Sequence, residues 1–89
     1  VVSSMAANKQ LTSAQLIDSS YHYYDISQFE KSIEWGTHAL KKGKREKNKY
    51  DIMVAHLAIA KSQYFVQDYA SSMNNLLSTL KLALELKNR

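Results

Sequence analysis

The stretch LIDSSYHYYDISQFEKSIEWGTHAL, residues 16–40, decides the fold because its pattern returns 40 positions later in the chain. The matching pairs are Ile17 and Leu57, Tyr24 and Tyr64, Ile26 and Val66, Phe29 and Tyr69, Ser32 and Ser72, Ile33 and Met73, Leu40 and Leu80, and Lys41 and Lys81. A repeat of this length with helical spacing inside each unit indicates helical hairpins that stack on one another. We therefore predict an all-α fold of two stacked antiparallel helical hairpins.

The composition supports this fold class. The 89 residues include no proline and only two glycines, so the turn signals that a β-sandwich or barrel needs are missing. The absence of cysteine excludes disulfides and thiolate metal sites, although it leaves the compartment open. No apolar run approaches the ~18 residues of a membrane span, and Val1–Lys9 does not resemble a signal peptide. The start at valine indicates either a piece of a longer protein or a processed chain.

Capping patterns divide the chain into four expected helices. Thr12–Gln15, T-S-A-Q, has the spacing of a capping box that opens a helix, and Ser27–Glu30, S-Q-F-E, predicts a second one. Gly43 is expected to take the left-handed conformation that ends the second helix, and Lys41–Lys49 to form a basic loop. Asp68 is the expected N-cap of the fourth helix.

Six residues of the first unit follow a spacing known from one family of helical repeats. They are Leu16, Ser20, Tyr23, Phe29, Ser32 and Ala39. This pattern resembles the tetratricopeptide repeat, and the resemblance implies a fragment of a right-handed α-solenoid. It divides the chain into a lead-in or end of a preceding repeat at 1–11, one repeat at 12–46, and a second at 47–89 with an extended C-terminal helix. The spacing of 40 exceeds the family's usual length of about 34 and resembles the degenerate repeats of bacterial regulators and sensor proteins.

The resemblance implies that the first helix of each hairpin lines a concave groove that binds a peptide or helix of another protein. The groove positions would be Ala14, Ile17, Tyr21, Tyr24, Asp25, Val54, Leu57, Lys61, Tyr64 and Phe65. Tyrosine suits recognition because it combines a large ring, a polar tip and few rotatable bonds. The alternative is that several of these residues pack one hairpin on the other.

The fourth expected helix carries more apolar residues than one hairpin can cover. A further repeat of a parent protein would cover them, or they would form a self-association surface that makes a homodimer or part of a ligand-sensing segment. The residues of this expected surface are Met73, Leu77, Leu80 and Leu84.

The formal charge of +4 is concentrated in one segment, which holds six of the twelve lysines and arginines. They are Lys41, Lys42, Lys44, Arg45, Lys47 and Lys49. Such a cluster can bind nucleic acid as an accessory site. We favour a solvated loop over nucleic-acid binding, because no aromatic residue is interleaved to stack on bases.

Catalytic and metal-binding patterns are missing from the sequence. His22, His38 and His56 lack a metal-ligand spacing, and no nucleophile or phosphate-binding loop accompanies them. We therefore expect no enzyme, no cofactor and no metal. The sequence favours a module that binds a protein or peptide, within a larger regulatory or sensor protein.

Overall fold

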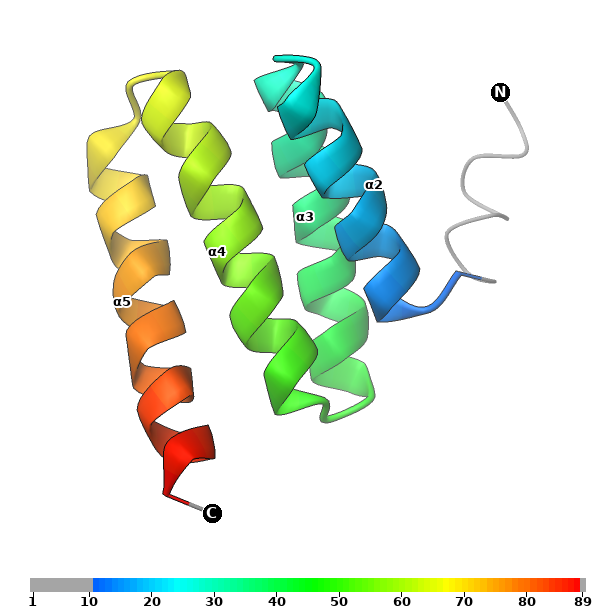
Figure 1. Cartoon of the computed structure of the whole chain (residues 1–89), viewed down its shortest axis with the longest axis vertical. Helices are drawn as coiled ribbons and strands as arrows, with labels where there is room; N and C mark the ends of the chain where they lie inside the picture. Colours follow the sequence, from blue (N-terminus) through cyan, green and yellow to red (C-terminus); the bar gives the residue numbers. More distant parts are fainter. Residues whose placement is uncertain (1–10, 89) are drawn as a thin grey trace.

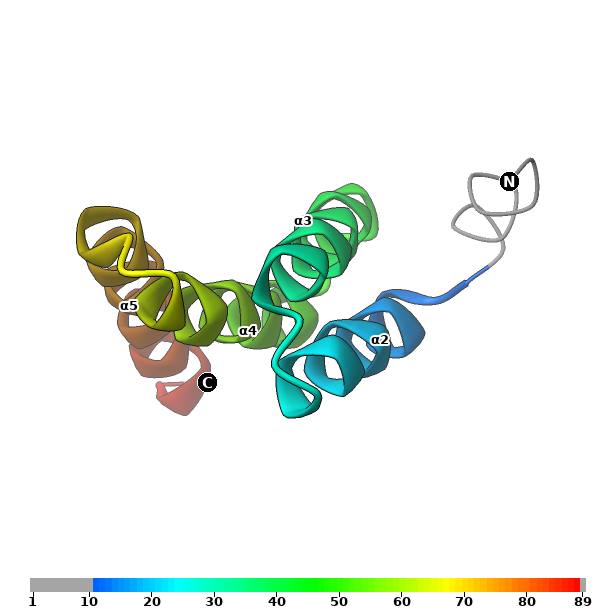
Figure 2. The same ribbon diagram turned by 90° about the horizontal axis from the view of Figure 1, so that it is seen from above.

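The computed structural model describes residues 11–88, which form four helices (Figure 1). The helices are α2 (Ser13–Asp25), α3 (Phe29–Arg45), α4 (Lys49–Phe65) and α5 (Tyr69–Lys87). Each helix runs antiparallel to the next and packs against it, and α2 also packs against α4. Seen from above, the four helices follow a zigzag (Figure 2). The all-α prediction is confirmed, with four helices in sequential contact.

Three turns of the same construction join the helices. The middle residues Ser27, Lys47 and Gln67 have φ values of 61°, 55° and 67°. In each turn this residue donates its N–H three positions back, and the next residue donates five positions back, as in the Schellman motif. The three middle residues stand 20 positions apart, so two 17-residue helices with their three-residue turns account for the 40-residue repeat.

Two of the four predicted helix signals are confirmed. Thr12 forms the capping box: its Oγ1 accepts from the Gln15 N–H at 3.1 Å, and its own N–H donates to Gln15 Oε1 at 2.9 Å. Asp68 caps α5, because its Oδ1 accepts from the Ser71 N–H at 3.3 Å. Both residues lie outside the left-handed position of a turn, so their side chains are free to cap.

The other two signals were wrong. Ser27 does not cap α3, because it already occupies the left-handed position of the preceding turn; the N-cap is Gln28, which makes no side-chain capping bond. Gly43 does not end α3 either: it is buried inside the helix, where a Cβ would lie 3.2 Å from Ile52 Cγ1. The expected loop 41–49 is therefore mostly helical, and only residues 46–48 form the turn.

Small residues fill most of the contacts between helices. One cluster of the hydrophobic core is formed by Leu16, Ile17, Ala39 and Ala55, with partly buried side chains around it. Further buried apolar residues are Ala58, Ile59 and Ala60 of α4. Gly36 allows the Ile59 side chain to come close, since a Cβ at Gly36 would lie 2.7 Å from Ile59 Cγ1. The group that comes close to Gly36 is therefore a buried side chain of α4.

Buried serines tie the helices together through hydroxyl bonds. Ser20 of α2 donates to the Ser32 carbonyl of α3 at 2.7 Å, and Ser62 of α4 donates to Ser32 Oγ at 2.8 Å. In the second hairpin the second helix is the donor instead of the first: Ser72 of α5 donates to the Ala60 carbonyl of α4 at 2.8 Å. Each buried hydroxyl thus has a partner, as the cost of an unpaired buried donor requires. None of the helices within 11–88 has the length and apolarity to cross a membrane.

Candidate partner-binding surfaces

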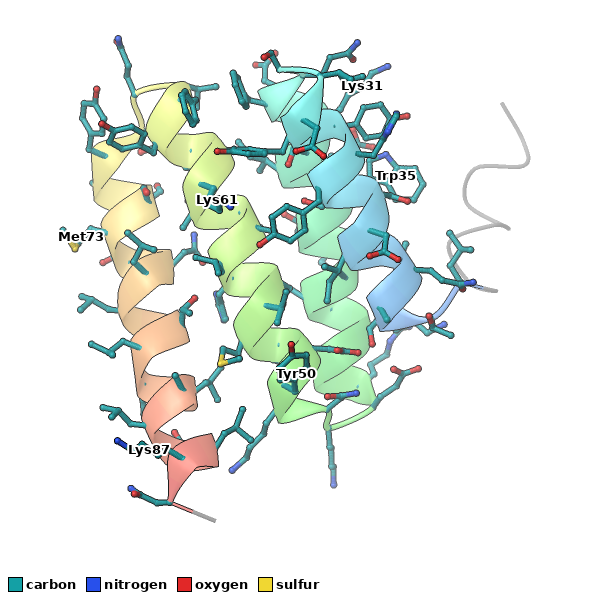
Figure 3. The ribbon with its side chains drawn as sticks, in the orientation of Figure 1. Lys31, Trp35, Tyr50, Lys61, Met73 and Lys87 are labelled. Carbon is teal, nitrogen blue, oxygen red and sulfur yellow. The ribbon has the colours of Figure 1, made fainter. Side chains whose placement is uncertain are left out.

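A lysine from α4 lies between two tyrosines of α2. The Nζ of Lys61 is 5.1 Å from the ring centre of Tyr21 and 5.0 Å from that of Tyr24 (Figure 3). These are cation–π distances. The tyrosine rings meet edge to face, with centres 6.4 Å apart. The contact between α2 and α4 therefore places aromatic faces and one cation at a single position.

Phe65 extends this group toward the end of the bundle that holds turns 26–28 and 66–68 (Figure 1). Its ring meets Tyr24 at 5.8 Å and stacks on Phe29 at 4.9 Å with an interplanar angle of 6°. Tyr64 and Tyr69 continue the row of ring contacts to α5. Phe65 is nevertheless 53% exposed. Aromatic pairs of this geometry contribute about 0.5–1.5 kcal/mol each, so the rings hold one another in place while part of their surface stays open.

We call Tyr21, Tyr24, Lys61 and Phe65 the α2–α4 face. Burial raises the pKa of the Tyr21 phenol, and the neighbouring Tyr24 and Tyr50 raise it further. Tyr21 therefore stays protonated as a hydrogen-bond donor at neutral pH.

The remaining expected groove residues are dispersed. Ile17 belongs to the core and is 7% exposed, and Val54 packs against the same core, so these two follow the packing alternative. Ala14 and Asp25 are exposed, and Leu57 is half-buried. Phe29, whose ring stacks on Phe65, was not among the expected groove residues, because no residue spacing signals a contact between two residues so far apart in the chain.

The expected self-association residues lie together on one exposed side of α5. Met73, Leu77, Leu80 and Leu84 are each 53–57% exposed. Figure 3 shows Met73 pointing away from α4. A shallow hollow on this side is lined mainly by Leu77, Leu80 and Leu84. We call these four residues the α5 face.

Polar side chains occupy the opposite side of α5, against α4. His56 Nδ1 lies 2.7 Å from Asn75 Oδ1, and Asn75 Nδ2 donates to Gln63 Oε1 at 2.8 Å. Thr79 Oγ1 donates to the Met53 carbonyl at 3.3 Å. Asn75 and Thr79 therefore face α4, whereas Leu77, Leu80 and Leu84 are exposed.

The basic residues lie around turn 46–48, at the end of the bundle opposite turns 26–28 and 66–68 (Figure 1). Lys42, Lys44 and Arg45 belong to the last turn of α3, where positive charge suits the negative end of the helix dipole. Lys41 directly precedes Lys42 in α3, and Lys47 lies in the 46–48 turn. Lys49 forms an ion pair with Glu85 of α5 at 3.3 Å. Several of these charges therefore have a local electrostatic role.

The three histidines lie apart. His22 contacts the Tyr23 ring, His38 the Trp35 ring, and His56 the Asn75 amide. Across residues 11–88 no three metal-ligating side chains come together.

Comparisons with protein-family models, with curated proteins and with solved structures find no match for this chain. What the chain does must therefore be inferred from its own geometry.

Proposed function

We propose that the chain is a tetratricopeptide-like interaction module whose α2–α4 face binds a peptide or helix of another protein. The observation that carries the proposal is the placement of Lys61 between Tyr21 and Tyr24, beside the exposed ring of Phe65. Large rings held by their neighbours lose little conformational entropy on binding, which suits them to recognition.

The chemistry of the face indicates what it would bind. Ring faces offer apolar contact area, the Tyr21 and Tyr24 hydroxyls offer hydrogen bonds, and Lys61 offers one positive charge. A hollow beside the aromatic rings, lined in part by Phe29 and Val66, adds a position for one more side chain. An extended or helical peptide with apolar residues and a carboxylate fits this combination.

A random-peptide display library selected on the immobilised chain tests the proposal. We expect enriched peptides whose affinity falls at least about tenfold with Tyr24→Ala, because a centrally placed aromatic residue contributes strongly to binding. Tyr23→Ala is the matched control: this tyrosine of α2 is half-buried like Tyr24, but its ring lies against Trp35 and His22 rather than against the α2–α4 face. Failure to enrich peptides over an unrelated helical protein, or equal binding by both variants, would contradict the proposal.

A further inference from the structure

The α5 face, Met73, Leu77, Leu80 and Leu84, is the largest group of exposed apolar side chains on one described helix. We infer that it binds the same face of a second copy of the chain, with the two α5 helices antiparallel. The two-fold axis of this homodimer passes between residues 78 and 79. This inference is independent of the α2–α4 face and of its ligand.

The spacing of the α5 face suits a helix pair. Its residues follow one another at intervals of four, three and four, which is the a/d alternation of a coiled-coil seam. The opposite side of α5 is already used, because Asn75 and Thr79 bond to α4. The side of α5 that carries Asn75 and Thr79 is therefore committed within the chain, and the apolar seam is left for a partner helix.

Head-to-tail stacking of a second copy would not reproduce the contact that joins α3 and α4. Inside the chain, α4 fits onto α3 by placing Ile52 against Gly43 and Ile59 against Gly36. Forty positions earlier, α2 would have to use Thr12 and Ser19 for the same contacts. Thr12 is already committed as the N-cap, and Ser19 is small and polar. Pairing α5 with α5 instead brings apolar side chains together.

Charge and size decide the orientation. In the antiparallel pair, Met73 faces Leu84 of the second copy, and Leu77 faces its Leu80, so all four layers are apolar. Lys87, which continues the same spacing beyond Leu84, then faces the small Ala70. A parallel pair would place Lys87 against Lys87 of the second copy, and like charges across a seam oppose association.

Sedimentation equilibrium over a concentration series tests the dimer. We expect the wild-type chain to pass from monomer to dimer, and Leu80→Glu to raise the dissociation constant on the order of 100-fold, because both copies then bring a carboxylate into the seam. Ile26→Glu is the matched control, since Ile26 is 50% exposed but lies at the end of α2. Circular dichroism and Trp35 fluorescence verify that both variants stay folded.

Disulfide trapping tests the orientation, and the chain suits it because it has no cysteine of its own. Met73→Cys and Leu84→Cys variants are mixed and oxidised, and the products are resolved by mass. The antiparallel pair predicts the mixed product. It disfavours the two symmetric ones, because equivalent residues lie roughly 16 Å apart along the axis and disulfide Cα atoms are about 4.4–6.8 Å apart.

The inference is overturned if the chain stays monomeric throughout the series. It is also overturned if the Leu80→Glu and Ile26→Glu variants dimerise with the same dissociation constant. Symmetric disulfides in place of the mixed product would also overturn it. Tyr24→Ala leaves the dimer intact, so failure of the dimer and failure of the α2–α4 face are distinguishable.

Discussion

Replacing Gly36 with alanine tests how tightly α3 and α4 are packed. The new Cβ would lie 2.7 Å from Ile59 Cγ1, whereas two carbons in contact prefer about 3.5–4.0 Å, and it would lie 3.1 Å from Ser20 Oγ. Ile59 is 4% exposed, so it has little room to move. Overpacking of this kind costs about 1–3 kcal/mol, while alanine gains about 1 kcal/mol in helix propensity. The net loss of unfolding free energy should be ~1 kcal/mol.

Gly43→Ala is the matched control. Gly43 is also buried within α3, and its new Cβ would lie 3.2 Å from Ile52 Cγ1, a smaller overlap. The same gain of about 1 kcal/mol in helix propensity applies, so the net change should be close to zero. The difference between the two variants therefore isolates the contact with Ile59.

Urea unfolding, followed by circular dichroism and by the fluorescence of the single tryptophan, Trp35, measures both variants. Trp35 stacks on the Tyr23 ring at 6.4 Å, so it reports on the α2–α3 hairpin, and coincident transitions verify two-state unfolding. A loss of 1 kcal/mol corresponds to about 4–8 °C in melting temperature for a domain of this size. The packing argument is refuted if Gly36→Ala is as stable as Gly43→Ala.

A double-mutant cycle with Ile59→Ala locates the effect. Truncating Ile59 alone should cost ~2–5 kcal/mol. It should cost about 1–2 kcal/mol less in the Gly36→Ala background, because the overlapping Cγ1 is then gone. Additive effects would show that the cost of Gly36→Ala arises elsewhere.

Three further changes probe the turns, the serines and the α2–α4 face. Lys47→Gly should stabilise the chain by ~0.5–1 kcal/mol, because Lys47 has a φ of 55°, a left-handed conformation that glycine adopts without strain. Lys44→Gly, inside α3, should instead destabilise it by ~1 kcal/mol, and urea unfolding compares the two variants. Ser32→Ala should cost ~1–3 kcal/mol because Ser62 Oγ loses its acceptor, and adding Ser62→Ala should recover part of this loss in the same assay. Burial first, and then nearby phenols, raise the pKa of Tyr21 above 10.0 in the folded state. Its contribution to stability is therefore complete below the unfolded pKa and is lost as the pH rises through the folded pKa. The unfolding free energy should accordingly fall less steeply above pH 10 in Tyr21→Phe, and equal slopes would contradict this.

The start of a helix could be predicted from the sequence where a nearby side chain caps it. Thr12 and Asp68 cap the helices that they were expected to cap, because capping depends on residues within three positions. Gly43 could not be predicted in the same way. Whether a glycine ends a helix or admits a neighbour depends on Ile52, which belongs to another helix. The left-handed position went instead to Lys47, a residue without a glycine's freedom.

The repeat itself could be predicted, but not the reason for its length. The turns at Ser27, Lys47 and Gln67 have the same backbone conformation and recur every 20 residues. The repeating unit of the backbone is therefore one helix with its turn, and a hairpin contains two such units. Serine, lysine and glutamine share no signal for a left-handed conformation. The turn is fixed by the two backbone hydrogen bonds that close each helix, and sequence periodicity does not reveal those bonds.

The candidate surfaces could be predicted only in part. Tyr21, Tyr24 and Lys61 were among the expected groove residues, and the structure brings their side chains together. Ile17 fell in the same group because helical periodicity cannot distinguish a side chain at the edge of a contact from one inside it. Its burial depends on how closely α2 approaches α4, and these two helices are not neighbours in the sequence.

The distribution of side-chain size links the fold to its proposed role. The buried positions hold mostly serine, alanine and glycine, and the largest fully buried side chain is Leu16. The large apolar residues lie instead at the surface, on α5 and at the aromatic end. Small residues let the helices approach closely, but each buries little apolar area, and stabilisation scales with that area. Association that covers the exposed leucines would add the apolar burial that the interior lacks, and binding to the folded state stabilises it by mass action. A chain built in this way would gain stability from a bound partner, which agrees with the interaction role that we propose.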